Sequence, residues 1–124
     1  MNSFSFPIFV WIIGLASAGK STLATGLKRR LTVTSLPSLL LDGDDLRGGL
    51  CRGLGFSDAD RTENLRRAAE VSALAARSGI GTVAAMITPL RSQREMIAQV
   101  LAGHHLLWVW ADCPAAECQR RDVK

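Results

Sequence analysis

The sequence predicts one α/β domain over residues 1–124, with a parallel sheet of about four strands and helices on both faces. Three observations predict this fold class. The 124 residues are 48% hydrophobic and 21% charged, an ordinary globular composition for a single domain. Short apolar runs alternate with longer segments of helical periodicity, as in parallel sheets joined by crossover helices. A loop bounded by glycines and followed by lysine separates the first apolar run from the first helical segment.

The first third of the chain predicts a strand, a helix and a second strand. Residues 8–15 form an apolar run that is too short to span a membrane, and we expect a buried strand that ends at Gly14. Residues 20–31 predict a helix, because three leucines recur at four-residue spacing and would share one face. Residues 36–41 predict the second strand. The three leucines are Leu23, Leu27 and Leu31.

The middle of the chain predicts a glycine-rich connection and a long helix. Residues 47–55 contain four glycines and predict a loop or a broken helix. Ser57 is a candidate N-cap for the helix that follows, and Gly79 is expected to end that helix. One face of this helix carries small residues, which favour close packing against a sheet. That face consists of Leu65, Ala68, Ala69, Ser72, Ala75 and Ala76.

The last third predicts two further strands and two helices. Residues 80–87 and 105–111 are the apolar runs of the strands. A helix is expected from Thr88-Pro89 to about Ala102, and another opens within residues 114–121. The buried side of the first of these helices is predicted to consist of Met96, Ile97, Val100 and Leu101.

Residues 14–21 read GLASAGKS and match the phosphate-binding loop of P-loop NTPases, G-x-x-x-x-G-K-[ST]. Gly14 and Gly19 permit a backbone whose N–H groups point at phosphate oxygens. Lys20 is placed to reach the β- and γ-phosphates, and the Ser21 hydroxyl to bind Mg²⁺. The predicted ATP-binding residues here are Gly14, Leu15, Ala16, Ser17, Ala18, Gly19, Lys20, Ser21 and Thr22.

Three carboxylates follow the second predicted strand, where ligands bind in open α/β sheets. Asp42 is a candidate magnesium ligand together with Ser21. Asp44 is a candidate to orient or deprotonate an acceptor hydroxyl. Asp45 is interpreted as an ordinary acidic residue in the first turn of a helix.

Several segments together resemble the adenylylsulfate kinase (APS kinase) family, which phosphorylates the 3′-hydroxyl of adenosine 5′-phosphosulfate with ATP. They occur in the family's order and cover nearly the whole chain. The most specific is LGFSDADRTENLRR at residues 54–67, because it concerns the acceptor rather than the phosphates. The others are residues 14–22, LDGDDLR at 41–47, AEV at 69–71, ITPLRSQR at 87–94 and CQRRDVK at 118–124.

The resemblance implies roles for residues on the acceptor side. Asp44 would be the base or orienter for the 3′-hydroxyl, and Arg47 and Arg61 would bind the phosphosulfate. Phe56 would stack on the adenine, with Asn64 nearby. These types suit the chemistry, since arginine binds oxyanions bidentately and an aromatic ring stacks on a flat purine.

Other positions are assigned by the same resemblance. Lys20 and Thr88 are candidate catalytic residues, although Thr88 stands where the family usually has serine. Arg121 is a candidate contact to the ATP adenine. Arg66 and Arg67 are interpreted instead as a solvated helix face, paired with carboxylates three or four residues away. Those carboxylates are Glu63 and Glu70.

The resemblance predicts a Mg²⁺-dependent cytoplasmic transferase that binds ATP or ADP and adenosine 5′-phosphosulfate, as in sulfate assimilation. The family's C-terminal lid, last strand and last helix would follow Lys124, and their absence is expected to weaken turnover. A homodimer and a fusion to an ATP sulfurylase domain remain open. Two alternative functions are a non-catalytic nucleotide-binding regulatory module and another small-molecule P-loop kinase.

Composition excludes several other classes. The net charge of +4 has no basic run longer than residues 28–30, which favours anionic ligands over nucleic acid. No segment predicts a membrane span. Three cysteines without a C-x-x-C pair argue against both a disulfide framework and a zinc site, so a reduced compartment is expected.

Overall fold

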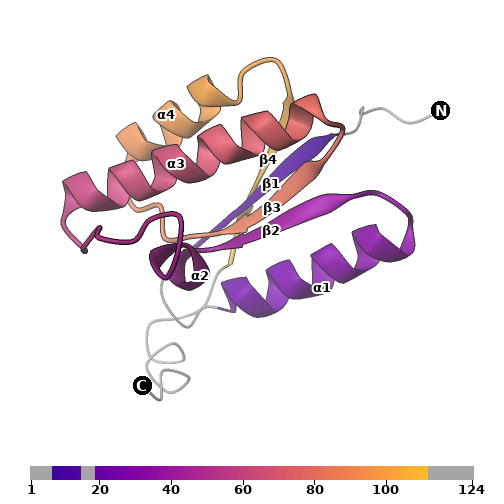
Figure 1. Ribbon diagram of the computed structural model, residues 1–124, viewed down its shortest axis with the longest axis horizontal. Helices are drawn as coiled ribbons and strands as arrows, with labels where there is room; N and C mark the ends of the chain where they lie inside the picture. Colours follow the sequence, from indigo (N-terminus) through magenta and orange to yellow (C-terminus); the bar gives the residue numbers. More distant parts are fainter. Residues whose placement is uncertain (1–6, 15–18, 112–124) are drawn as a thin grey trace.

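The structure is a computed structural model that describes residues 7–14 and 19–111 of the chain (Figure 1). This part of the chain holds four strands and four helices, and strands and helices alternate except that α3 directly follows α2. Their bounds are β1 (Ile8–Ile13), α1 (Lys20–Val33), β2 (Ser38–Asp42), α2 (Gly43–Arg47), α3 (Asp58–Arg77), β3 (Gly81–Ala85), α4 (Arg91–Val100) and β4 (His105–Trp110). The helix predicted within residues 114–121 lies outside the described residues.

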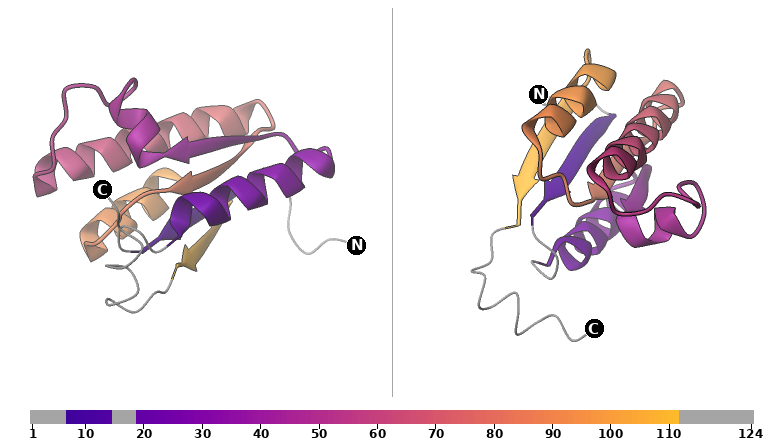
Figure 2. Two further views of the ribbon diagram at one scale, coloured as in Figure 1. Left: turned by 90° about the horizontal axis from the view of Figure 1, so that it is seen from below. Right: turned by 90° about the vertical axis from the view of Figure 1, so that its left-hand side faces the viewer.

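The strands form one parallel sheet in the order β2-β3-β1-β4. β1 is central and nearly all buried, as its continuous apolar sequence predicts. Helix α1 covers one face of the sheet, and α3 and α4 cover the other (Figure 2). The predicted fold class is therefore confirmed: a parallel α/β sheet of four strands, in the described residues, with helices on both faces.

The core on the α1 side corrects one expectation from the sequence. Ala24 is fully buried against the sheet, and Leu27 and Leu31 pack beside it, but Leu23 is exposed. A strict four-residue spacing fails because each step of four residues passes a full helical turn by about 40°. Three successive leucines at that spacing therefore do not all face the sheet. Ala24, instead of Leu23, packs against the sheet with Leu27 and Leu31.

The core on the opposite face matches the predicted pattern of small residues on α3. Leu65, Ala68, Ala69, Ser72 and Ala76 are buried, while Ala75 is partly buried. Small side chains let α3 lie close to the sheet. On α4, the four residues predicted to be on the buried side are buried or partly buried as expected.

Helix ends follow the signals in the sequence with one exception. The Ser57 side chain accepts a hydrogen bond from the Asp60 N–H (3.1 Å), and Gly79 ends α3 with φ 78°. Helix α4 begins at Arg91, three residues later than Thr88, because a residue before proline is disfavoured in the helical conformation. Among the described residues, no helix has the length and apolar character needed to cross a bilayer.

A buried glutamine joins the two helices that share a face of the sheet. Gln93 on α4 is fully buried. Its Oε1 accepts from the Leu90 N–H (3.1 Å), which caps the start of α4. Its Nε2 donates to the Thr62 hydroxyl on α3 (3.0 Å). Gln93 therefore fixes the start of α4 against the first half of α3, near the cavity described below.

Replacing Gln93 with an apolar side chain of similar size should destabilise the fold. We expect Gln93→Leu to lower the free energy of unfolding by about 1–3 kcal/mol, because the Leu90 N–H and the Thr62 hydroxyl lose a buried partner. Urea denaturation measures the change. Gln99→Leu, at an exposed position of the same helix, is the control and should be close to neutral. Equal stabilities of the two variants would contradict this role.

Candidate functional site

A cavity of about 310 Å³ lies at the carboxyl ends of the strands, beside α2 and the first turns of α3. This is the edge at which parallel α/β sheets bind ligands. Segments far apart in the sequence meet there, because α2 directly follows β2 and the segment after β3 lies next to it (Figure 1). The lining residues are Lys20, Ser21, Asp42, Gly43, Asp44, Arg47, Phe56, Arg61, Asn64, Ala85, Met86 and Ile87.

Both glycines of the predicted phosphate loop have positive φ angles, as the motif requires. Gly19 caps α1 with φ 95°. At Gly14, with φ 150°, a Cβ would lie 2.6 Å from the Ala111 carbonyl oxygen, so a larger residue would collide with backbone. Lys20 is the first residue of α1, is buried, and lines the cavity. Residues 15–18, which carry Leu15, Ala16, Ser17 and Ala18, lie outside the described residues, and Thr22 is exposed in the first turn of α1.

The Asp42 carboxylate links two sides of the cavity: the phosphate side, lined by Lys20 and Ser21, and the second side, lined by Asp44, Arg47, Phe56, Arg61 and Asn64. Its Oδ2 accepts from the Ser21 hydroxyl (2.5 Å), and its Oδ1 accepts from the Asp44 N–H (2.9 Å) to cap α2. A hydroxyl and a carboxylate oxygen side by side are ligands that Mg²⁺ prefers. In residues 7–14 and 19–111, no group of three or more His, Cys, Asp or Glu could hold a metal. A cation at Ser21 and Asp42 would therefore need oxygens from phosphate and water.

The second side of the cavity combines two guanidinium groups with an aromatic ring. The Cζ of Arg47 lies 4.1 Å from the centroid of the Phe56 ring, and the Cζ of Arg61 lies 5.8 Å from it. The Arg61 Nε also donates to the Phe56 carbonyl (3.0 Å). Phe56 is 65% exposed, an unusual position for a large apolar side chain at a cavity. The arrangement suits a ligand that is both aromatic and anionic.

Two buried polar atoms at this side have no hydrogen-bond partner within the described part of the chain. They are the Nε of Arg47, a donor, and the Oδ1 of Asn64, an acceptor. Both residues line the cavity. Buried polar groups without partners cost free energy, so a ligand in the cavity that bonds these two atoms would gain affinity from them.

The other carboxylates and the threonine have distinct settings. Asp44 is exposed and lines the cavity, whereas Asp45 lies in the first turn of α2 and is not among the lining residues, as the sequence predicts. Thr88 is buried outside the lining, and its hydroxyl donates to the Met86 carbonyl (3.1 Å). Its backbone carbonyl accepts from Arg94 (2.9 Å). This setting places Thr88 against Met86, the cavity-lining residue that follows β3, rather than in the lining itself. Arg121 lies outside the described residues.

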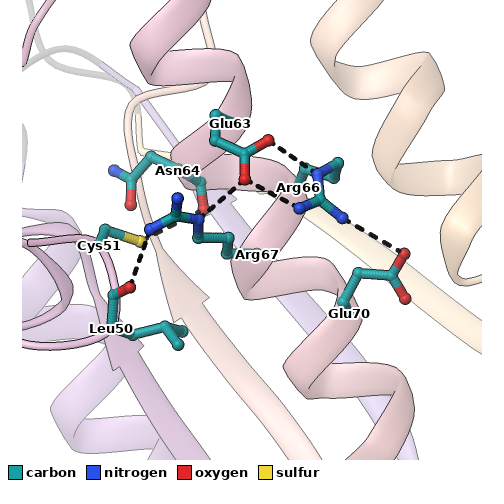
Figure 3. Close-up of polar contacts among 7 residues, drawn as sticks. All are labelled: Leu50, Cys51, Glu63, Asn64, Arg66, Arg67 and Glu70. Atoms are coloured by element: carbon teal, nitrogen blue, oxygen red, sulfur yellow. Dashed lines mark hydrogen bonds and ion pairs between the residues drawn. The ribbon is translucent and has the colours of Figure 1, made fainter. Parts of the chain in front are cut away.

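The interpretation of Arg66 and Arg67 as one solvated helix face is half right (Figure 3). Arg66 is exposed and pairs with Glu63 (2.8 Å) and Glu70 (3.9 Å), as expected. Arg67 is more buried; it pairs with Glu63 (2.8 Å) and also donates to the Leu50 carbonyl in the glycine-rich connection (3.1 Å). The helical spacing could predict the ion pairs but not the contact to Leu50, which lies 17 residues earlier.

The two arginines change the titration of Glu63. Hydrogen bonds from Arg66 and then Arg67 stabilise the charged carboxylate and lower the pKa of Glu63 to about 2, from 4.5. Nearby, burial raises the pKa of the Cys51 thiol above its usual value. Cys51 is free and buried.

Comparison with known proteins gives a consistent picture. A family model described as adenylylsulphate kinase matches residues 6–124. The adenylyl-sulfate kinase of Pseudomonas aeruginosa is 45% identical over 118 residues, which cover 95% of this chain and 60% of that protein. That of Bacteroides thetaiotaomicron is 46% identical over 117 residues, which cover 94% of this chain and 58% of that protein.

A solved structure is similar over the same region. The Mycobacterium tuberculosis APS kinase CysC, in complex with AMPPNP and APS, superposes with a TM-score of 0.90 at 41% identity. The match covers 94% of this chain and 69% of that one. The chain thus spans about 60% of the length of the curated relatives it matches.

The pKa of Glu63 predicts how its ion pairs depend on pH. Because the folded-state pKa is lowered, the stabilisation is complete above about pH 4.5 and is lost as the pH falls toward 2. We expect the difference in unfolding free energy between wild type and Glu63→Gln to shrink across that range, as measured by urea denaturation at each pH. Glu95→Gln, at an exposed site on α4, is the control. A difference that does not change between pH 6 and 2 would contradict the assignment.

Proposed function

The chain belongs to the adenylylsulphate kinase family, and we propose that it transfers the γ-phosphoryl group of ATP to the 3′-hydroxyl of adenosine 5′-phosphosulfate. One observation carries the proposal: a single cavity is lined both by residues of a phosphate-binding loop and by an aromatic and cationic set. A nucleotide donor and a nucleotide acceptor need these two sets next to each other. The products would be ADP and 3′-phosphoadenosine 5′-phosphosulfate.

The donor would lie on the phosphate side. The loop from Gly14 to Gly19 would hold the phosphates through backbone N–H groups, and Lys20 would contact the β- and γ-phosphates. Ser21 and Asp42 are the residues that would hold Mg²⁺, which when bound neutralises charge on those phosphates. Buried Lys20 supplies a cation that water screens less than an exposed one.

The acceptor would lie against Phe56, with its adenine stacked on the ring. Arg47 and Arg61 would bind the phosphosulfate oxygens, since both guanidinium groups already lie close to the ring. The partnerless Nε of Arg47 could donate to an anionic oxygen, and the Oδ1 of Asn64 could accept from an amino or hydroxyl group. A nucleotide that carries phosphate and sulfate supplies both kinds of group.

The reaction would then need one proton acceptor between the two nucleotides. The Asp44 carboxylate, exposed at the cavity, would orient the 3′-hydroxyl and accept its proton as the oxygen–phosphorus bond forms. The bond between the γ-phosphorus and the β,γ-bridging oxygen breaks, and ADP leaves. Catalysis would consist mainly of positioning and charge stabilisation. Thr88 would act indirectly, by fixing the end of the strand that leads to Met86.

The direct test is acceptor-dependent phosphoryl transfer. The chain is incubated with ATP, Mg²⁺ and adenosine 5′-phosphosulfate, and the products are followed by ³¹P NMR. A new 3′-phosphate resonance that grows in step with ADP would support the proposal. ADP formation that does not depend on the acceptor would contradict it. Binding of both nucleotides without any product would favour a non-catalytic regulatory module instead.

Replacing Asp44 should separate chemistry from binding. We expect Asp44→Asn to lower kcat by about 10²- to 10⁴-fold, because an amide cannot accept the proton of the hydroxyl. The KM values should change little. Asp45→Asn, one residue away in the same turn but outside the cavity lining, is the matched control and should retain its rate. Equal losses of kcat in the two variants would contradict the role of Asp44, because they would show that the rate depends only on the negative charge at the start of α2.

Replacing Phe56 should weaken the acceptor alone. We expect Phe56→Ala to raise the dissociation constant for adenosine 5′-phosphosulfate by about tenfold or more, the usual cost of losing a stacked base. The affinity for ADP should stay the same. Leu74→Ala, on α3, also removes an exposed apolar side chain and serves as the control. Acceptor binding that is unchanged in Phe56→Ala would favour a kinase with a non-purine acceptor.

A further inference from the structure

The segment that joins α2 to α3, residues 48–57, carries much of the second side of the cavity. Arg47 directly precedes it, and Phe56 lies near its end. The segment contains no regular secondary structure and is rich in glycine. Cys51 is its one fully buried residue, Leu54 packs partly buried against the core, and Leu50 is exposed. With this limited apolar burial, polar contacts contribute much of what fixes Arg47 and Phe56 relative to each other.

Polar contacts from α3 hold this segment in place. The Arg67 Nη1 donates to the Leu50 carbonyl (3.1 Å), and the adjacent Cys51 thiol points at the Asn64 carbonyl (3.9 Å). Farther along, the Gly55 N–H donates to the Asp60 carboxylate (2.8 Å). Leu50 and Cys51 are thus fixed to the part of α3 that bears Asn64, as Figure 3 shows.

The orientation of the Arg67 guanidinium is set by Glu63. The Arg67 Nε donates to the Glu63 Oε2 (2.8 Å), which leaves Nη1 directed at Leu50. Glu63 is in turn held by two hydrogen bonds from Arg66 (2.8 Å each). A planar guanidinium that bonds a carboxylate on one edge and a carbonyl on another has little freedom to rotate.

The contact at Leu50 reaches the acceptor side through a short turn. The Cys51 N–H donates to the Leu46 carbonyl (2.7 Å), and the Gly49 N–H donates to the same carbonyl (3.1 Å). Leu46 is buried on α2, one residue before Arg47. Holding the Leu50 carbonyl therefore holds the end of α2 and the start of the segment that leads to Phe56.

We propose that Arg67 is a positioning residue for the acceptor: it acts through the Leu50 carbonyl to hold Arg47 and Phe56 at the separation the acceptor needs. The inference rests on the proposed function, because it assigns the second side of the cavity to the acceptor. Arg67 does not line the cavity and touches no ligand in this account. Its effect should therefore fall on acceptor affinity, while the phosphate side, formed by β1 and α1, keeps its nucleotide affinity.

Arg66 provides a matched control on the same helix. It is bonded to the same Glu63 and carries the same charge, but it extends toward Glu70, and none of its hydrogen bonds or ion pairs in the described structure reaches residues 48–57. A general effect of charge or of ion pairing on α3 would appear in both arginine variants. An effect through Leu50 would be larger in the Arg67 variant, since only Arg67 bonds the Leu50 carbonyl.

The experiment is calorimetric titration of the full chain with ADP·Mg²⁺ and then with adenosine 5′-phosphosulfate. We expect Arg67→Ala to raise the acceptor dissociation constant by about tenfold while that of ADP is unchanged, the cost of a displaced binding group. Arg66→Ala should match wild type for ADP and lose clearly less acceptor affinity than Arg67→Ala, because the Arg67 contacts to Glu63 and Leu50 are still present. If Arg67→Ala does not fold, Arg67→Lys replaces it with the same expected split, since lysine lacks the planar fork that bonds Glu63 and Leu50 together.

Three outcomes would overturn the inference. Arg67→Ala could bind the acceptor as tightly as wild type, it could lose ADP and acceptor affinity equally, or Arg66→Ala could lose acceptor affinity to the same extent. Failure of the proposed function is distinguishable from all three. In that case wild type itself would bind ADP·Mg²⁺ and show no saturable binding of adenosine 5′-phosphosulfate.

Discussion

The two oxygens of one carboxylate, that of Asp42, link the first turn of α1 to the start of α2 at the cavity. One oxygen accepts from the hydroxyl of Ser21 at the start of α1, and the other caps α2 at Asp44. Asp42 itself ends β2, a strand fixed in register against β3. The phosphate side and the acceptor side are thereby built on the same edge of a rigid parallel sheet.

The two sides of the cavity differ in how they are held. The phosphate side lies between a buried central strand and a helix, so its geometry follows from the packing of the sheet. The acceptor side rests on a glycine-rich segment that hydrogen bonds from α3 secure at Leu50, Cys51, Gly55 and Phe56. A side held by a few polar contacts is easier to distort, and it is also easier to open for a ligand.

Sequence reasoning recovered the parts that depend on local chemistry. The Ser57 cap and the small face of α3 follow from spacing alone, and the structure confirms them. Of the predicted glycine–lysine loop, the structure describes Gly14 and Gly19, both with positive φ, and Lys20 and Ser21 at the cavity. The contact from Arg67 to Leu50 was missed because it depends on how the glycine-rich segment folds back, and helical spacing carries no signal for that. Leu23 was misplaced because a four-residue repeat drifts around a helix. The roles of Asp44, Phe56, Arg61 and Asn64 stay predictions, now with one cavity that they share.

The central claim is that two nucleotides occupy this cavity side by side. Calorimetric titration with adenosine 5′-phosphosulfate, in the absence and in the presence of saturating ADP·Mg²⁺, tests it most directly. The account predicts saturable acceptor binding with one site per chain in both conditions, because Lys20 and Ser21 on one side and Phe56 and Arg61 on the other serve different ligands. Loss of acceptor binding when ADP·Mg²⁺ is present would mean that the two nucleotides compete for one site, and would contradict it.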